Sequence, residues 1–146
     1  MKFNHAEKGQ SLVELALSLL LILTLLAGAV DLGSAFFSYI AVRDAAQEGA
    51  LYGSIDPLNT GAIVSRVRGA SGPPGPPKPK PVDLYDLTKV TVSVTTSTTP
   101  CSGGWVTVSV SYNYQLTMPL IGAIIGRQTI PLTASATDTI LIPSCP

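Results

Sequence analysis

The residues with the clearest chemical potential lie near the N-terminus, where Glu14 stands at the entrance of a long apolar run. A charge in membrane hydrocarbon costs roughly 2.5 kcal/mol or more at depth, so a simple anchor gains nothing from this carboxylate. A cut between Gly9 and Gln10 would place an α-amine, mostly cationic at neutral pH, one helical turn from Glu14. The spacing therefore predicts a charge pair that forms after cleavage. The alternative is an uncleaved signal anchor in which Glu14 is an incidental interfacial charge.

Groups that enzymes use for catalysis are scarce in the rest of the chain. The single histidine, His5, lies in the segment expected to be removed, and two cysteines without a histidine cannot form a usual zinc site. The sequence contains no phosphate-binding loop, dinucleotide-binding loop or nucleophile elbow. Nine basic residues balance nine acidic ones, which argues against a nucleic-acid partner. We therefore expect no enzymatic activity, no metal or other cofactor, and no binding of nucleic acid.

The apolar run has the length and composition of a membrane span. Residues 15–30 contain no charge, and with residues 12–14 they approach the ~20 residues needed to cross ~30 Å of hydrocarbon. Lys2 and Lys8 precede the run, whereas Asp31 is the first charge after it. The positive-inside rule then places the N-terminus in the cytoplasm and the chain after Asp31 outside.

The helical pattern continues beyond the membrane. Residues 31–53 lack proline and repeat apolar side chains at helical spacing, so residues 11–52 predict one helix about 60 Å long. Small residues also recur at four-residue steps, a pattern that allows another backbone to approach closely. The pattern leaves open whether this face packs on the protein's own sheet or on a neighbouring subunit. The small residues are Ala29 and Gly33, followed by Ala41, Ala45, Gly49 and Gly53.

After a proline-rich spacer the period of the apolar residues changes from helical to two. The spacer at 72–81 favours extended polyproline II. Alternation of valine with threonine or serine predicts strands over 90–95 and 106–114, and a third over 129–142. The short apolar segment 118–125 is expected to be a buried connection that covers one end of the sheet.

Together these patterns predict an α+β chain in which a long N-terminal transmembrane helix extends into a small antiparallel β-sheet domain. Its expected parts are a leader at 1–9, a long helix at 10–55, a linker at 56–87 and a β-domain at 88–146. Within the helix, the span covers about 12–30 and the extracytoplasmic extension covers 31–53.

The two cysteines fit this arrangement. Cys101 lies in the loop between the first two strands, and Cys145 follows the third. If the third strand runs antiparallel to the second, it ends beside that loop, so we expect a disulfide between them. Closing about 44 residues would stabilise the domain by roughly 4 kcal/mol. Two unpaired thiols are the alternative.

The N-terminal residues carry a family resemblance. The segment Lys8-Gly9-Gln10-Ser11-Leu12-Val13-Glu14-Leu15-Ala16 resembles the N-terminus of TadE-like proteins, the minor pilins or pseudopilins of tight-adherence (Flp-type) pili. The likeness continues into residues 31–33 and into 43–50, which are similar to the family's Ala-Ala-x-Glu-Gly-Ala segment, and covers about the first 53 residues. Gln47 and Leu51 stand where the family often has arginine, and the proline-rich tract departs from the family pattern.

The resemblance implies a role and partners. Gly9 and Gln10 would flank the site of a prepilin peptidase, and Glu14 would be the assembly glutamate. Other partners would be pilin subunits, membrane lipid, an inner-membrane assembly platform and a cytoplasmic secretion ATPase. The expected protein is a minor pilin or pseudopilin of a tight-adherence pilus or type II-like secretion assembly, stored in the cytoplasmic membrane before it enters a surface pilus. The alternative is an uncleaved single-span protein that presents a disulfide-closed β-domain as an adhesin or receptor.

Overall fold

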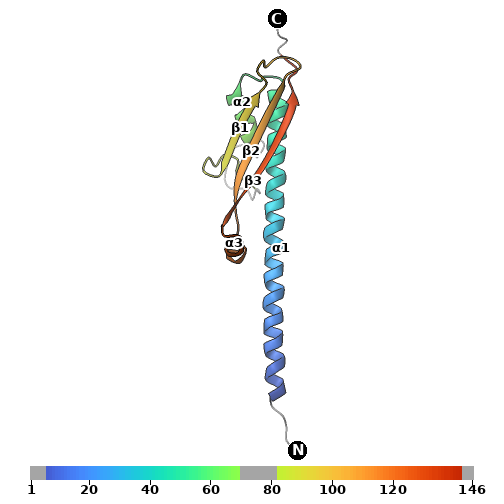
Figure 1. Ribbon diagram of the computed structural model, residues 1–146, viewed down its shortest axis with the longest axis vertical. Helices are drawn as coiled ribbons and strands as arrows, with labels where there is room; N and C mark the ends of the chain where they lie inside the picture. The colour runs from blue at the N-terminus through green and yellow to red at the C-terminus, as the bar shows by residue number, and fades with distance from the viewer. Residues whose placement is uncertain (1–5, 70–81, 143–146) are drawn as a thin grey trace, which may run out of the picture.

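The protein is an α+β chain in which one long helix stands beside a small antiparallel sheet, as the sequence predicts (Figure 1). A computed structural model describes residues 6–69 and 82–142. The elements, in chain order, are α1 (Ala6–Gly53), α2 (Thr60–Gly69), β1 (Val90–Thr96), β2 (Trp105–Gln115), α3 (Pro119–Ile125) and β3 (Thr129–Thr139). Residues 1–5 of the predicted leader and the whole spacer at 72–81 lie outside the described residues.

Helix α1 is a single uninterrupted helix of 48 residues, about 70 Å long at the usual rise per residue. It ends at Gly53, where the chain turns and the amide of Ser54 still donates to the carbonyl of Ala50 at 2.9 Å. The sheet lies against its C-terminal half, and its N-terminal half extends away from the sheet (Figure 1). The prediction of one helix that continues beyond the apolar run is confirmed.

The sheet has the order β1-β2-β3 with both pairs antiparallel, so β2 is the central strand. Val106, Val108 and Val110 of β2 are fully buried, whereas the alternate residues are only partly covered. On the opposite face the hydroxyls of Thr107 and Thr137 lie 2.7 Å apart across β2 and β3. The predicted alternation is therefore confirmed, and one face of the sheet forms the core with α1. Strand β3 ends at Thr139, three residues before the predicted limit at 142.

The C-terminal part of the small-residue pattern packs inside the molecule. A Cβ atom added to Gly49 would collide with the side chain of Val67 in α2 and lie 3.1 Å from Cγ1 of Val108. A Cβ atom on Gly53 would lie 3.0 Å from Cγ2 of Val106. These glycines let α1 approach the central strand and α2 closely. The part of the small-residue face that contains Gly49 and Gly53 therefore packs on the protein's own domain.

Helix α2 lies within the segment 56–87, where the sequence predicts only a linker. Its two buried residues, Ile63 and Val67, are one turn apart and pack into the core. Arg66 on its outer side forms an ion pair with Glu48 of α1, with 2.7 Å between Nε and Oε1. The first part of the predicted linker thus belongs to the packed domain.

The connection between β2 and β3 differs from the prediction. The segment 118–125 is not a buried cover for the sheet but contains α3, in which Ile124 is 78% exposed and Ile125 is 46% exposed. Pro119 suits the first turn of a helix, and Gly126 ends it with a φ of 77°. Helix α3 projects beyond the end of the sheet, beside the middle of α1, so its outer side stays uncovered (Figure 1).

The C-terminal end of β3 lies beside the loop between β1 and β2, as antiparallel pairing predicts. The amide of Gly103 donates to the carbonyl of Ile140, and the amide of Ile140 donates to the carbonyl of Gly104, both at 2.9 Å. Cys101 is in this loop, whereas Cys145 lies outside the described residues. The Cys101–Cys145 disulfide therefore stays a prediction, and the geometry of the loop favours it.

Candidate functional site

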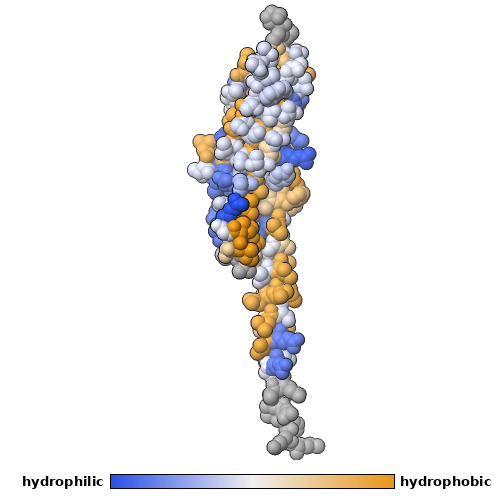
Figure 2. All heavy atoms as spheres, in the orientation of Figure 1, coloured by the Kyte–Doolittle hydropathy of each residue, from blue (hydrophilic) through white to orange (hydrophobic). Residues whose placement is uncertain are grey.

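The most prominent surface of the protein is the N-terminal half of α1, whose large apolar side chains are mostly exposed; Figure 2 shows them on one face. Helix α1 is long and apolar enough to cross a membrane, and its most hydropathic 18-residue window has no part buried within the structure. A helix that is apolar all round needs either lipid or other apolar helices around it. The exposed apolar residues of this half include Leu12, Val13, Leu15, Leu17, Leu19, Leu20, Leu21, Ile22, Leu23, Leu25, Leu26 and Val30.

The predicted cleavage and assembly residues lie near the N-terminal end of α1, which is the end remote from the sheet (Figure 1). Gly9, Gln10 and Glu14 are all exposed, and a Cβ atom added to Gly9 would meet nothing within 4 Å. Gln10 and Glu14 are four residues apart in the helix, so they share one face. The fold therefore imposes no constraint on Gly9, and it leaves the carboxylate of Glu14 accessible to an amine of this chain or of another.

A second charged residue, Asp31, joins α1 to the sheet, a role that the sequence does not predict. Its side chain is only 4% exposed. Oδ1 accepts a hydrogen bond from the hydroxyl of Tyr114 at 3.0 Å and from the amide of Thr117 at 3.2 Å. Oδ2 accepts one from the amide of Met118 at 3.2 Å. Asp31 thus fixes the end of β2 and the start of α3 against α1, at the point where the predicted span ends.

The contacts of Asp31 favour its charged form. Burial raises the pKa of this carboxyl, but the backbone hydrogen bonds from Thr117 and Met118 and the hydroxyl of Tyr114 outweigh burial, and the pKa is held below its ordinary value. Burial and the neighbouring carboxylate of Asp31 raise the pKa of Tyr114, which keeps its hydroxyl protonated as the donor. Asp31, which follows the predicted span at 12–30, is therefore a carboxylate at neutral pH.

The Asp31 contact predicts acid-sensitive stability. Because the folded-state pKa is lowered, its stabilisation is complete above the ordinary carboxyl value and is lost as the pH falls through the folded-state pKa. Asp31→Asn should cost about 2 kcal/mol near neutral pH and should flatten the acid limb of the stability curve. Thermal unfolding in detergent between neutral and strongly acidic pH measures both effects. The control is Asp44→Asn at an exposed position of the same helix. An acid limb that is unchanged in Asp31→Asn would refute this role.

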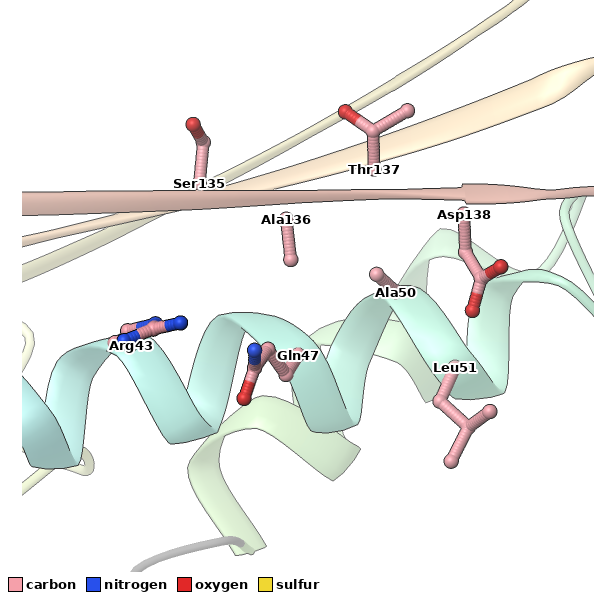
Figure 3. A pocket seen from close by; sticks show the side chains of 8 residues that line it. All are labelled: Arg43, Gln47, Ala50, Leu51, Ser135, Ala136, Thr137 and Asp138. Atoms are coloured by element: carbon pink, nitrogen blue, oxygen red, sulfur yellow. The ribbon is translucent and has the colours of Figure 1, made fainter.

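A groove of about 500 Å³ runs between α1 and β3 (Figure 3). Ala136 and Asp138 point from the strand toward the helix, whereas Ser135 and Thr137 point away from it (Figure 3). Arg43 lies at one end of the groove and Asp138 at the other (Figure 3). The full lining is Arg43, Gln47, Ala50, Leu51, Ser135, Ala136, Thr137 and Asp138. The lining combines a cation, an anion and small residues without a nucleophile beside a base, so it suits contact with another surface better than catalysis.

Within residues 6–69 and 82–142, no group of three or more histidine, cysteine, aspartate or glutamate residues is arranged to hold a metal ion. The chemistry that the described residues do offer is a free carboxylate at the end of an apolar helix and a second carboxylate that locks this helix to the sheet.

These features define a protein that combines an N-terminal helix able to cross a membrane with a small α+β domain packed on the helix's other half. Residues 9–51 match the model of the TadE-like protein family. The match confirms the resemblance that the motifs of α1 carry, and it ends before α2 and the sheet. The similarity to TadE-like proteins is thus confined to α1, the helix that is long and apolar enough to cross a membrane. Neither the search of curated proteins nor that of solved structures gave a match.

Proposed function

We propose that the chain is a minor pilin or pseudopilin of a tight-adherence pilus or a type II-like secretion assembly. In this proposal a prepilin peptidase cuts between Gly9 and Gln10, and the subunit assembles through α1. The observation that carries the proposal is the division of α1 into two halves. The sheet and Asp31 hold the C-terminal half, whereas the N-terminal half is bare and carries Glu14 one turn from Gln10.

In this proposal the charge pair determines the axial position at which one subunit docks on the next. After cleavage, the α-amine of Gln10 pairs with Glu14 of the same chain or of a neighbouring subunit. Two charges that are unfavourable in an apolar bundle then neutralise each other, and removal of one leaves the other unpaired. A subunit that docks one turn out of register leaves both charges unpaired. Docking that repeats head to tail, with a rotation that does not close, produces a helical filament.

The proposed location is the cytoplasmic membrane, with one span. The N-terminus faces the cytoplasm and the sheet domain is extracytoplasmic, because Lys2 and Lys8 precede the apolar run and Asp31 follows it. The proposed partners are the prepilin peptidase, other pilin subunits, the inner-membrane platform and membrane lipid. A minor subunit is favoured over a major one because the C-terminal domain is large beside the very short subunits that such pili usually polymerise. The role is structural, without catalysis.

Processing is the first test of this proposal. Gly9→Val should block cleavage, because a branched side chain then stands at the bond to be cut, while the fold is preserved since position 9 has open surroundings. The matched control is Gly33→Val, the same change at another α1 glycine with nothing within 4 Å of an added Cβ atom. Intact mass and N-terminal sequencing of protein from native membranes and from sheared surface material measure the outcome.

We expect the wild type and Gly33→Val to begin at Gln10 and Gly9→Val to begin at Met1. A wild-type chain that begins at Met1 and stays in the membrane would contradict the proposal. It would favour the uncleaved protein that presents its β-domain as an adhesin or receptor.

A further inference from the structure

Helix α3 lies at the same height along α1 as the last turns of the predicted membrane span. Cδ1 of Ile121 is 3.9 Å from the position that a Cβ atom on Gly28 would occupy. Gly28 belongs to the span predicted at 12–30, and α3 lies beside the middle of α1, below the sheet (Figure 1). A membrane that surrounds residues 12–30 therefore reaches α3 as well.

The outward side of α3 has the composition of an interfacial membrane contact. Ile124 is 78% exposed and Ile125 is 46% exposed. Arg127, which is also exposed, follows the C-cap residue Gly126. The end of the sheet domain that faces the bare half of α1 forms an apolar patch with hydrophilic residues beside it (Figure 2). Apolar side chains next to an arginine suit the boundary between acyl chains and headgroups, where the arginine reaches the phosphates.

The backbone at the start of α3 has few amide groups that need water as a hydrogen-bond partner. The amides of Thr117 and Met118 donate to Asp31, and Pro119 has no amide hydrogen. The amide of Gly122 donates to the carbonyl of Met118 at 3.4 Å. Unsatisfied backbone donors are what usually keeps a loop out of the bilayer. The hydrogen bonds to Asp31 thus satisfy the backbone donors just before α3 and lower the cost of placing this helix at the membrane surface.

We infer that α3 is a second membrane contact, which rests in the outer leaflet of the bilayer that α1 crosses. Ile124 and Ile125 lie among the upper acyl chains and Arg127 lies at the phosphates. Lipid fits this surface better than a protein partner does, because the patch lies at the same height along α1 as the end of the predicted span. A groove of about 520 Å³ beside Asp31, lined by Leu26, Val30 and Met118 among others, extends the apolar surface from α1 toward α3. The inference rests on the proposed membrane span of α1.

Depth-dependent quenching of a single tryptophan tests the inference. Trp105 is the chain's one tryptophan and begins β2, at the end remote from α3, so Trp105→Phe gives a silent background. The full chain with Ile124→Trp is reconstituted into vesicles of phosphatidylcholine and phosphatidylglycerol that carry bromine on the upper acyl chains, bromine near the chain ends, or no bromine. Leu20→Trp, within the span, is the positive control. Leu58→Trp, exposed between α1 and α2, is the negative control.

We expect brominated lipid to remove about half of the fluorescence of Ile124→Trp, as for a side chain 5–10 Å into the interface, and to leave Leu58→Trp unchanged. If Leu20→Trp is quenched but Ile124→Trp is not, the span stands and the inference is wrong. An unquenched but blue-shifted Ile124→Trp would show that a second copy of the chain covers α3, which also overturns the inference. If Leu20→Trp escapes quenching, the proposed span fails and the inference falls with it.

Discussion

Replacing Glu14 by alanine is expected to give a protein that is cleaved and folded but remains in the membrane. Glu14 is exposed at the end of α1 that is remote from the sheet, so its loss removes no contact of the described domain. In the assembly, however, the α-amine of Gln10 would lose its partner and enter an apolar bundle unpaired. We expect the amount of subunit in sheared filaments to fall at least about tenfold, because an unpaired charge in such a bundle is strongly unfavourable.

Two further substitutions at the same position separate charge from size. Glu14→Gln keeps the length of the side chain and removes the charge, whereas Glu14→Asp keeps the charge on a shorter side chain. We expect Glu14→Gln to behave like Glu14→Ala and Glu14→Asp to retain part of the assembly. Quantitative immunoblots of membrane and sheared fractions measure the distribution, and intact mass confirms cleavage in each variant. Wild-type incorporation of Glu14→Gln would show that the charge pair does not drive assembly.

Replacing Gly49 by leucine is expected to separate α1 from the sheet. Even the first side-chain atom at this position collides with Val67, which is fully buried and cannot move aside. Overpacking of this kind costs typically 1–3 kcal/mol, and a leucine in so close a contact should cost about 3 kcal/mol or more. The better helix propensity of leucine recovers less than about 1 kcal/mol of this loss. Urea unfolding in detergent, followed by the fluorescence of Trp105 in β2, measures the change.

Gly33→Leu is the matched control for this prediction. Gly33 lies in the same helix, and a Cβ atom there meets nothing within 4 Å. We expect its unfolding midpoint to equal or slightly exceed that of the wild type, since only the helix propensity changes. Equal midpoints for Gly49→Leu and the wild type would mean that α1 and β2 are not packed as closely as Gly49 indicates.

The elements with strong periodicity could be predicted from the sequence. The apolar run and the absence of proline through residue 53 define α1, and alternating valines define β1 and β2. The family match over residues 9–51 confirms the resemblance that the motifs of α1 carry. These features depend on short stretches of chain, so no knowledge of distant contacts is needed to recognise them.

The features that depend on distant contacts could not be predicted. Asp31 follows the apolar run and has the local signature of a flanking charge, but its donors, Thr117 and Met118, lie more than eighty residues later. Helix α2 has only Ile63 and Val67 as buried residues, too few for a recognisable period. Helix α3 is apolar enough to suggest a core position. It is exposed because it projects beyond the end of the sheet, and its position along α1 depends on where the sheet packs on that helix.

The docking of the sheet on only one half of α1 has a consequence for how the subunit travels. The bare half exposes many leucine side chains, and among the described residues only α3 lies beside it, at its C-terminal end. An aqueous intermediate would expose all of that surface to water at roughly 25 cal/mol per Å², a cost too large for a passing state. In the proposed pilus assembly, the subunit would therefore exchange lipid neighbours for helix neighbours side by side, and the machinery that moves it would work at the lateral boundary between bilayer and filament.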